Sequence, residues 1–90
     1  MAPVNMTPSA YKHGFEIEEA IYVMDHFVGR EALGRIPGGS AWAYVGYLHE
    51  GSDRKMELLA NWYPPRTVEV FHFMDLTDKY RRLWKDESWR

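Results

Sequence analysis

The chain has 90 residues, no cysteine, 46% hydrophobic residues and 16% aromatic residues. This size and composition predict one globular domain with one core, because disordered chains are poor in aromatic residues. The lack of cysteine excludes a disulfide scaffold, a cysteine-based zinc site and a cysteine nucleophile, and it favours a cytoplasmic location. A net charge of −2 argues against a strongly basic nucleic-acid-binding domain.

Charge is unevenly distributed along the chain. Residues 1–53 contain three basic and seven acidic side chains, whereas residues 54–90 contain eight basic and six acidic ones. Any site for a polyanion is therefore expected in the C-terminal half.

The longest stretch without a charge, residues 36–48, contains Pro37 and is well short of the roughly 20 residues that a membrane-spanning helix needs. We expect no contact with a membrane.

The N-terminal third predicts an arm, a helix and a loop. Residues 1–10 contain two prolines and are expected to form a flexible arm, and residues 11–90 a single domain. Residues 16–28 carry apolar side chains at helical spacing, with acidic side chains in the first turn, and predict an amphipathic helix. Residues 29–40 contain four glycines and one proline, and predict a loop with at most a short strand at residues 32–36.

The remaining chain predicts a meander of strands followed by a helix. Residues 41–48 and 55–63 alternate in polarity and flank a polar turn, which indicates an antiparallel hairpin. Two prolines then stop the second strand before residues 67–74 form a third. Residues 75–87 predict a helix with Thr77 as its N-cap. The expected fold is therefore α+β, with an antiparallel sheet of three or four strands packed with an N-terminal and a C-terminal helix.

Strand alternation assigns side chains to faces of this sheet. In the third strand, His72 is expected on the same face as Val68 and Val70. In the second strand, Trp62 shares a face with apolar neighbours and is expected in the core, as is Trp42. Tyr63 lies next to the two prolines and is expected to be exposed, where it could stack on an unpaired base.

Histidines are the main candidates for chemistry. The chain has no phosphate-binding glycine loop, nucleophile elbow or HExxH motif, and no pair of histidines one helical turn apart, so we expect neither a metal site nor a cofactor. A histidine can take or give a proton near neutral pH. Cleavage of RNA through its own 2′-hydroxyl needs a base, an acid and a cation that stabilises the phosphorane.

His72 lies just ahead of a predicted helix that carries Lys79, Arg81 and Arg82. A histidine and several cations are therefore expected at one edge of the sheet. Spacing alone favours a simpler structure, in which His72 is a half-buried strand residue bonded to a neighbour and the basic residues form a solvated helix face.

Three short segments resemble a known family. Residues 11–20 (YKHGFEIEEA) resemble the opening of BrnT-like toxins and their small actinobacterial relatives, in which a basic residue, histidine and glycine precede an acidic-capped helix. Residues 51–59 (GSDRKMELL) and 68–74 (VEVFHFM), followed by Lys79-Tyr80, are similar to the hairpin and the closing strand and helix of those relatives. Met74 and Thr77 stand where such toxins tend to have arginines.

The resemblance implies a RelE-like fold and the toxin of a type II toxin–antitoxin module. It implies a metal-independent endoribonuclease that a cognate antitoxin neutralises, with the protein acting as a homo-oligomer or in a toxin–antitoxin hetero-oligomer. His72, Lys79, His13 and Tyr80 match the catalytic positions.

On this hypothesis His72 acts as base or acid, Lys79 stabilises the phosphorane, and His13 or Tyr80 is the second proton-transfer group. The groups expected to grip the RNA substrate are Arg54, Arg81, Arg82 and Tyr63. The alternatives are a non-catalytic protein-interaction module with the same fold and a small-ligand domain in an unrelated α+β fold.

Overall fold

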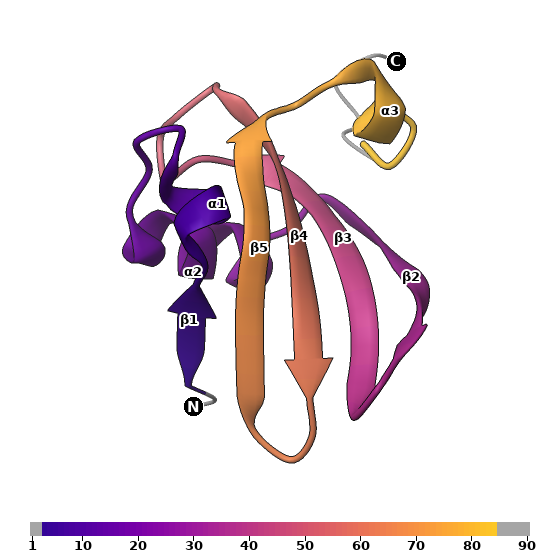
Figure 1. Cartoon of the computed structure of the whole chain (residues 1–90). Helices are drawn as coiled ribbons and strands as arrows, with labels where there is room; N and C mark the ends of the chain where they lie inside the picture. The colour runs from indigo at the N-terminus through magenta and orange to yellow at the C-terminus, as the bar shows by residue number, and fades with distance from the viewer. Residues whose placement is uncertain (1–2, 85–90) are drawn as a thin grey trace.

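A computed structural model of the chain describes residues 3–84, and Figure 1 shows the resulting α+β arrangement. The elements, in chain order, are β1 (Val4–Met6), α1 (Pro8–Tyr11), α2 (Ile17–Asp25), β2 (Gly29–Ile36), β3 (Gly39–Tyr47), β4 (Lys55–Tyr63), β5 (Thr67–Asp75) and α3 (Asp78–Arg81). The α+β class expected from the sequence is confirmed, with fewer helical residues and more strands than expected.

The five strands form one mixed sheet in the order β1-β5-β4-β3-β2. Strands β2 to β5 form an antiparallel meander, and β1 pairs with β5 in parallel. The N-terminal segment, expected to be a flexible arm, thus supplies an edge strand. Val4 pairs with Val68 and Met6 with Val70, and the Thr7 side chain caps α1 by accepting from the Ala10 N–H.

Strand β2 replaces the loop expected over residues 29–40. It pairs with β3 along its length, with a bulge that leaves Leu33 without a partner in the register. The glycines that indicated a loop serve this hairpin instead. Gly34, beside the bulge, and Gly38, in the turn to β3, both have positive φ, which glycine adopts without steric cost.

Helix α2 begins with a capping box formed by Glu16 and Glu19. The Glu16 backbone N–H donates to the Glu19 side chain at 2.8 Å, as part of a capping box. The helix ends at Asp25, three residues before the expected end, because the Val28 N–H already donates to the Val45 carbonyl of β3 at 2.8 Å. Phe27, expected on the apolar stripe of the helix, is 40% exposed.

The sheet has a core on each face. Helices α1 and α2 cover one face, which we call the α2 face, and α3 covers part of the other, the α3 face (Figure 1). The large buried side chains of the α2 face include Tyr44, Met56, Leu58 and Phe73. The smaller cluster of the α3 face joins Ala43 and Val45 to Tyr80 and Leu83.

A bulge in β5 reverses the expected facing of His72. The register passes from Ala60 opposite Val70 to Leu59 opposite His72, so Phe71 is an extra residue. Val70 and the next apolar residue, Phe73, are both buried in the core of the α2 face. His72 therefore does not share a face with Val68 and Val70, and projects from the α3 face instead.

Trp62 and the C-terminal helix also differ from expectation. Trp62 shares the face of Leu58 and Ala60 as expected, but it is 37% exposed because α2 does not extend over that end of the sheet. Trp42 is partly buried against the core.

Helix α3 is one turn long, and residues 85–87 of the expected helix lie outside the described residues. Within residues 3–84, no helix is long and apolar enough to cross a membrane.

Candidate functional site

Glu57 is the only buried charged side chain in the described part of the chain, with 2% of its surface exposed. It lies on β4 and projects from the α3 face, opposite Met74 of β5. A buried carboxylate is costly unless hydrogen bonds satisfy its oxygens. Its partners therefore define the local structure.

Three donors satisfy Glu57. The backbone N–H and the hydroxyl of Thr77 both donate to Oε1, at 2.7 Å and 2.5 Å. Oε2 lies 2.7 Å from Nε2 of His72. One carboxylate thus joins strand β5, through His72, to Thr77 at the start of α3. Thr77 is the N-cap residue as expected, but its hydroxyl bonds Glu57 rather than capping the helix.

This arrangement sets the proton positions on His72. Both oxygens of the Glu57 carboxylate are acceptors, so Nε2 of His72 carries a proton and donates it. In the neutral ring, Nδ1 is then the basic nitrogen. The side chain of His72 is 31% exposed, so the imidazole is both oriented by a buried carboxylate and open to solvent. Carboxylates that orient a histidine in this way support general-base catalysis in hydrolases.

The basic residues of α3 follow immediately. Lys79 lies two residues beyond Thr77, with its Nζ 5.5 Å from the centre of the Tyr80 ring. The Lys79 side chain is exposed and has no carboxylate partner within residues 3–84. Tyr80 itself is 6% exposed and packs in the core of the α3 face, so it anchors the helix.

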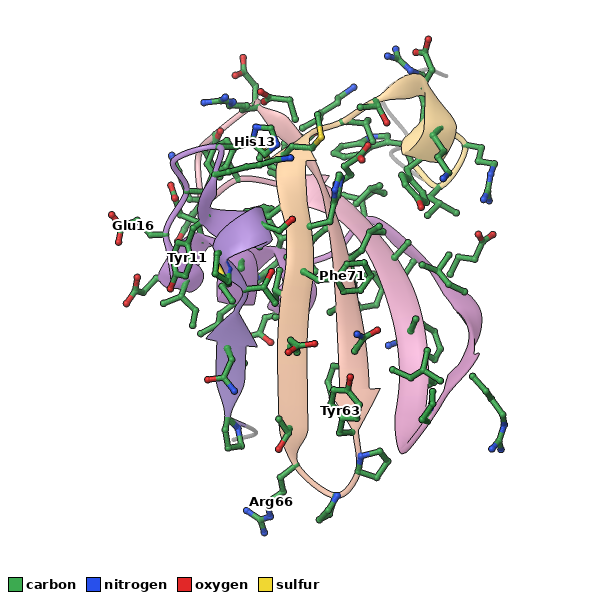
Figure 2. All side chains as sticks on the ribbon, viewed as in Figure 1. Tyr11, His13, Glu16, Tyr63, Arg66 and Phe71 are labelled. Carbon is green, nitrogen blue, oxygen red and sulfur yellow. The ribbon has the colours of Figure 1, made fainter. Side chains whose placement is uncertain are left out.

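His13 lies on a different face from His72. It is exposed in the segment between α1 and α2, near the end of β5 (Figure 2). The structure brings both histidines to the same end of the sheet, but the helices on the α2 face carry His13, whereas His72 projects from the α3 face. The expected pairing of His13 with His72 is therefore not seen.

The arginines expected to bind phosphate are engaged in ion pairs. Arg54 donates to both oxygens of Asp75 at 2.6 and 2.8 Å, and this contact raises the pKa of Arg54 and lowers that of Asp75. Arg82 donates in the same bidentate way to Glu31 at 2.6 and 2.7 Å, which lowers the pKa of Glu31.

Arg81 and Tyr63 complete the predicted set. Arg81 contacts Asp78 at 2.9 Å in an exposed pair within α3, a kind of contact that holds a side chain only weakly. Tyr63 is half-buried, not exposed, and lies at the opposite end of the sheet from His13 (Figure 2). Lys79 and Arg81 thus both lie on α3, and Glu57 links His72 to the residue that precedes this helix, whereas Tyr63 lies at the other end of the sheet (Figure 2).

Sequence reasoning missed Glu57. Alternation along β4 marks it as a polar residue on the outward face of a strand, which is the usual place for a solvated glutamate. The bulge at Phe71 determines the face of the sheet on which His72 lies, and no residue pattern in β5 predicts that bulge. Without it, Glu57 and His72 would be assigned to opposite faces.

Among residues 3–84, no group of three or more histidine, aspartate or glutamate side chains is placed to hold a metal ion. The chain matches no protein-family model, no curated protein and no solved structure. Functional inference therefore rests on the residues themselves.

Proposed function

We propose that this protein is the toxin of a type II toxin–antitoxin module, with a RelE-like fold, and that it cleaves RNA without a metal ion. The observation that carries the proposal is the pairing of His72 with the buried Glu57, which also binds Thr77, two residues before the exposed Lys79. A histidine held by a carboxylate, next to a cation, is suited to remove a proton from a 2′-hydroxyl and to stabilise the charged phosphorane.

In this mechanism each residue has one task. Nδ1 of His72 takes the proton of the 2′-hydroxyl, the 2′-oxygen attacks the adjacent phosphorus, and the bond from phosphorus to the 5′-oxygen breaks. The leaving 5′-oxygen takes a proton from solvent water, since His13 lies on the other face and Tyr80 is buried. Lys79 offsets the negative charge that develops on the phosphorane. Glu57 positions His72 and does not touch the RNA. A cognate antitoxin would neutralise the toxin, and RNA is the substrate.

Growth of a bacterial host after induction of the chain tests the proposal. The wild-type protein should arrest growth and degrade cellular RNA, and His72→Ala should abolish both effects. His49→Ala is the matched control, because His49 is an exposed histidine in the turn between β3 and β4 whose Nδ1 lies 3.1 Å from the Glu50 carbonyl oxygen. Both variants are first shown to fold by circular dichroism. If His72→Ala remains as toxic as wild type, His72 is not catalytic.

The alternative is a non-catalytic interaction module. The ion pairs of Arg54 and Arg82 favour it, because arginines already neutralised by carboxylates are poorly available to RNA phosphates. This alternative predicts that induced, soluble protein leaves growth and RNA unchanged and that a partner protein co-purifies with it.

A further inference from the structure

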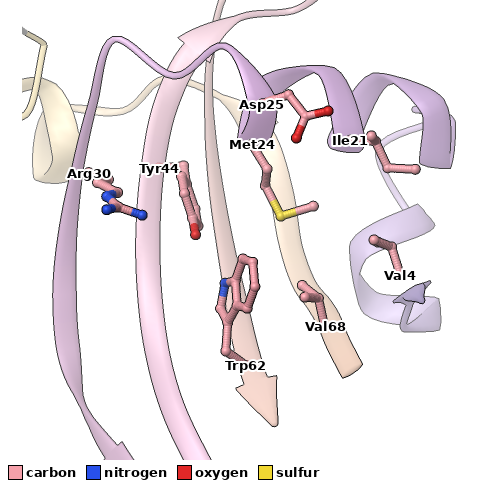
Figure 3. Close-up of a pocket in the computed structure, with 8 residues that line it drawn as sticks. All are labelled: Val4, Ile21, Met24, Asp25, Arg30, Tyr44, Trp62 and Val68. Carbon is pink, nitrogen blue, oxygen red and sulfur yellow. The ribbon is translucent and has the colours of Figure 1, made fainter. Parts of the chain in front are cut away.

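A cavity of about 280 Å³ lies on the α2 face, on the other side of the sheet from His72 (Figure 3). Its walls include the aromatic side chains of Tyr44 and Trp62, together with aliphatic side chains from α2, β1 and β5. Two charged residues, Arg30 and Asp25, border it. Most ligand pockets have an apolar lining with a few polar groups, and this cavity has the same composition.

A second hollow of about 290 Å³ shares Arg30, Tyr44 and Trp62 with this cavity and adds Trp42. The exposed part of Trp62 borders both spaces. A flat ring system entering from solvent would therefore meet tryptophan and tyrosine side chains along its path.

Arg30 is held in place without being neutralised. Its guanidinium lies 5.0 Å from the centre of the Phe27 ring and 4.9 Å from that of Trp42. Within the described residues, no carboxylate lies within ion-pair distance of it, in contrast to Arg54 and Arg82. Aromatic contacts restrict the side chain, and the guanidinium donors that do not bond the Tyr44 hydroxyl remain for an anion.

Tyr44 places a hydroxyl beside this cation. It is 2% exposed, and burial raises its pKa, although hydrogen bonding from Trp62 and Arg30 opposes the shift. The hydroxyl therefore remains protonated at neutral pH and adds an uncharged polar group to the wall near Arg30 (Figure 3).

We propose that this cavity binds a small planar aromatic molecule that carries one anionic group, with its ring against Trp62 and its carboxylate or phosphate on Arg30. The volume is near the lower end of the usual range for ligand pockets, about 300 to 1,000 Å³, and so fits one or two fused rings. This site is separate from the His72 site and does not depend on the proposed ribonuclease activity.

Titrations followed by NMR of the full-length ¹⁵N-labelled protein test the proposal. The probes are indole-3-acetate, uncharged indole and cationic tryptamine, which share one ring system and differ in charge. Indole-3-acetate should bind saturably, in the millimolar range or tighter, and shift the indole N–H signals of Trp42 and Trp62. Indole and tryptamine should bind at least about tenfold more weakly, because they lack the charge-assisted bond to Arg30.

Two arginine variants distinguish binding at this site from a general effect of the protein's positive charge. Arg30→Gln should reduce indole-3-acetate binding to the level of indole, again about tenfold or more. Arg66→Gln is the matched control, since Arg66 is an exposed arginine in the turn between β4 and β5 (Figure 2) and should leave binding unchanged. The NMR spectra of both variants show directly whether the fold is kept.

Adenosine monophosphate is titrated in the same way to identify the anion. If it binds with the same dependence on Arg30, the site accepts phosphate, and if only indole-3-acetate does, the site is specific for carboxylates. Equal binding of the three indole probes, binding that Arg30→Gln leaves unchanged, or no saturable binding of either anion would overturn the proposal.

Discussion

Replacing Glu57 with glutamine tests how the buried carboxylate controls His72. The amide keeps the shape of the side chain and one oxygen, which can continue to accept from Thr77. The amide nitrogen then faces His72, and because it is a donor, Nε2 of His72 must become the acceptor. The expected result is a reversal of the neutral tautomer, with the proton moving from Nε2 to Nδ1.

The energetic cost follows from the three hydrogen bonds. Bonds to a charged group contribute about 1.5 to 3 kcal/mol, against about 0.5 to 1.5 kcal/mol for neutral ones, so the loss is roughly 1 kcal/mol per bond. Three bonds give a gross loss of about 3 kcal/mol, which relief from burying a charge partly offsets. We expect the free energy of unfolding to fall by about 1 to 2 kcal/mol. Glu57→Ala should cost more, because it leaves Thr77 and His72 without their acceptor.

The assay is ¹⁵N NMR of the imidazole nitrogens at a pH where His72 is neutral, combined with denaturant unfolding. Glu57→Gln should fold and show the reversed tautomer, and it should lose toxicity because Nδ1 no longer accepts a proton. Thr77→Val, which removes one donor but leaves Glu57 charged, should keep the wild-type tautomer. If Glu57→Gln retains the wild-type tautomer, Glu57 does not determine the protonation of His72.

Three further predictions concern stability. Asp75→Asn should destabilise the protein by up to about 1 kcal/mol at neutral pH, because the pair with Arg54 is exposed. The pKa of Asp75 is lowered in the folded state. The difference in unfolding free energy between wild type and Asp75→Asn should therefore have its full size above the usual pKa of 3.8, and it should shrink as pH falls through the lowered pKa of the folded state. Urea unfolding at several pH values measures this difference. A difference that grows with acidity would contradict the assignment. Gly39→Ala should destabilise the protein by about 3 kcal/mol or more, because the new Cβ would lie 1.8 Å from the Trp62 carbonyl oxygen. Gly51→Ala should cost only about 1 kcal/mol, because Gly51 has a positive φ but open space around it. Similar thermal midpoints for the two glycine variants would show that this close approach does not exist. Phe73→Ala should lower the free energy of unfolding, measured by chemical denaturation, by about 3 to 5 kcal/mol. Phe73 is fully buried, and the centre of its ring lies 5.1 Å from that of the Phe15 ring. A loss below about 1 kcal/mol would place Phe73 outside the core.

Local patterns in the sequence were sufficient for much of the sheet. Alternation along β3 predicts Tyr44 and Val45 on opposite faces, and alternation along β4 does the same for Leu58 and Glu57; the structure confirms both. Thr77 was identified as the residue preceding the last helix, because a threonine there is a common N-cap. These features depend on neighbours in the chain, which a sequence displays directly.

Features that depend on distant pairing were not predictable. Strand β1 has three residues and forms only because β5 offers an edge, so its pattern resembles that of a loose arm. The glycines of β2 gave a loop signal although they permit a bulge and a tight turn. The bulge at Phe71 has the largest consequence, since it places His72 next to Glu57 and so determines the candidate site.

The chemical form of the cut RNA ends shows whether His72 promotes attack by the 2′-oxygen. RNA from cells that express the wild-type chain, His72→Ala or His49→Ala is mapped by a method that detects 5′-hydroxyl ends, the product of attack by a 2′-oxygen. The account predicts new 5′-hydroxyl ends with the wild-type and His49→Ala proteins and none with His72→Ala. If the three proteins give the same ends, or if soluble wild-type protein produces none, the claim that His72 cleaves RNA is contradicted.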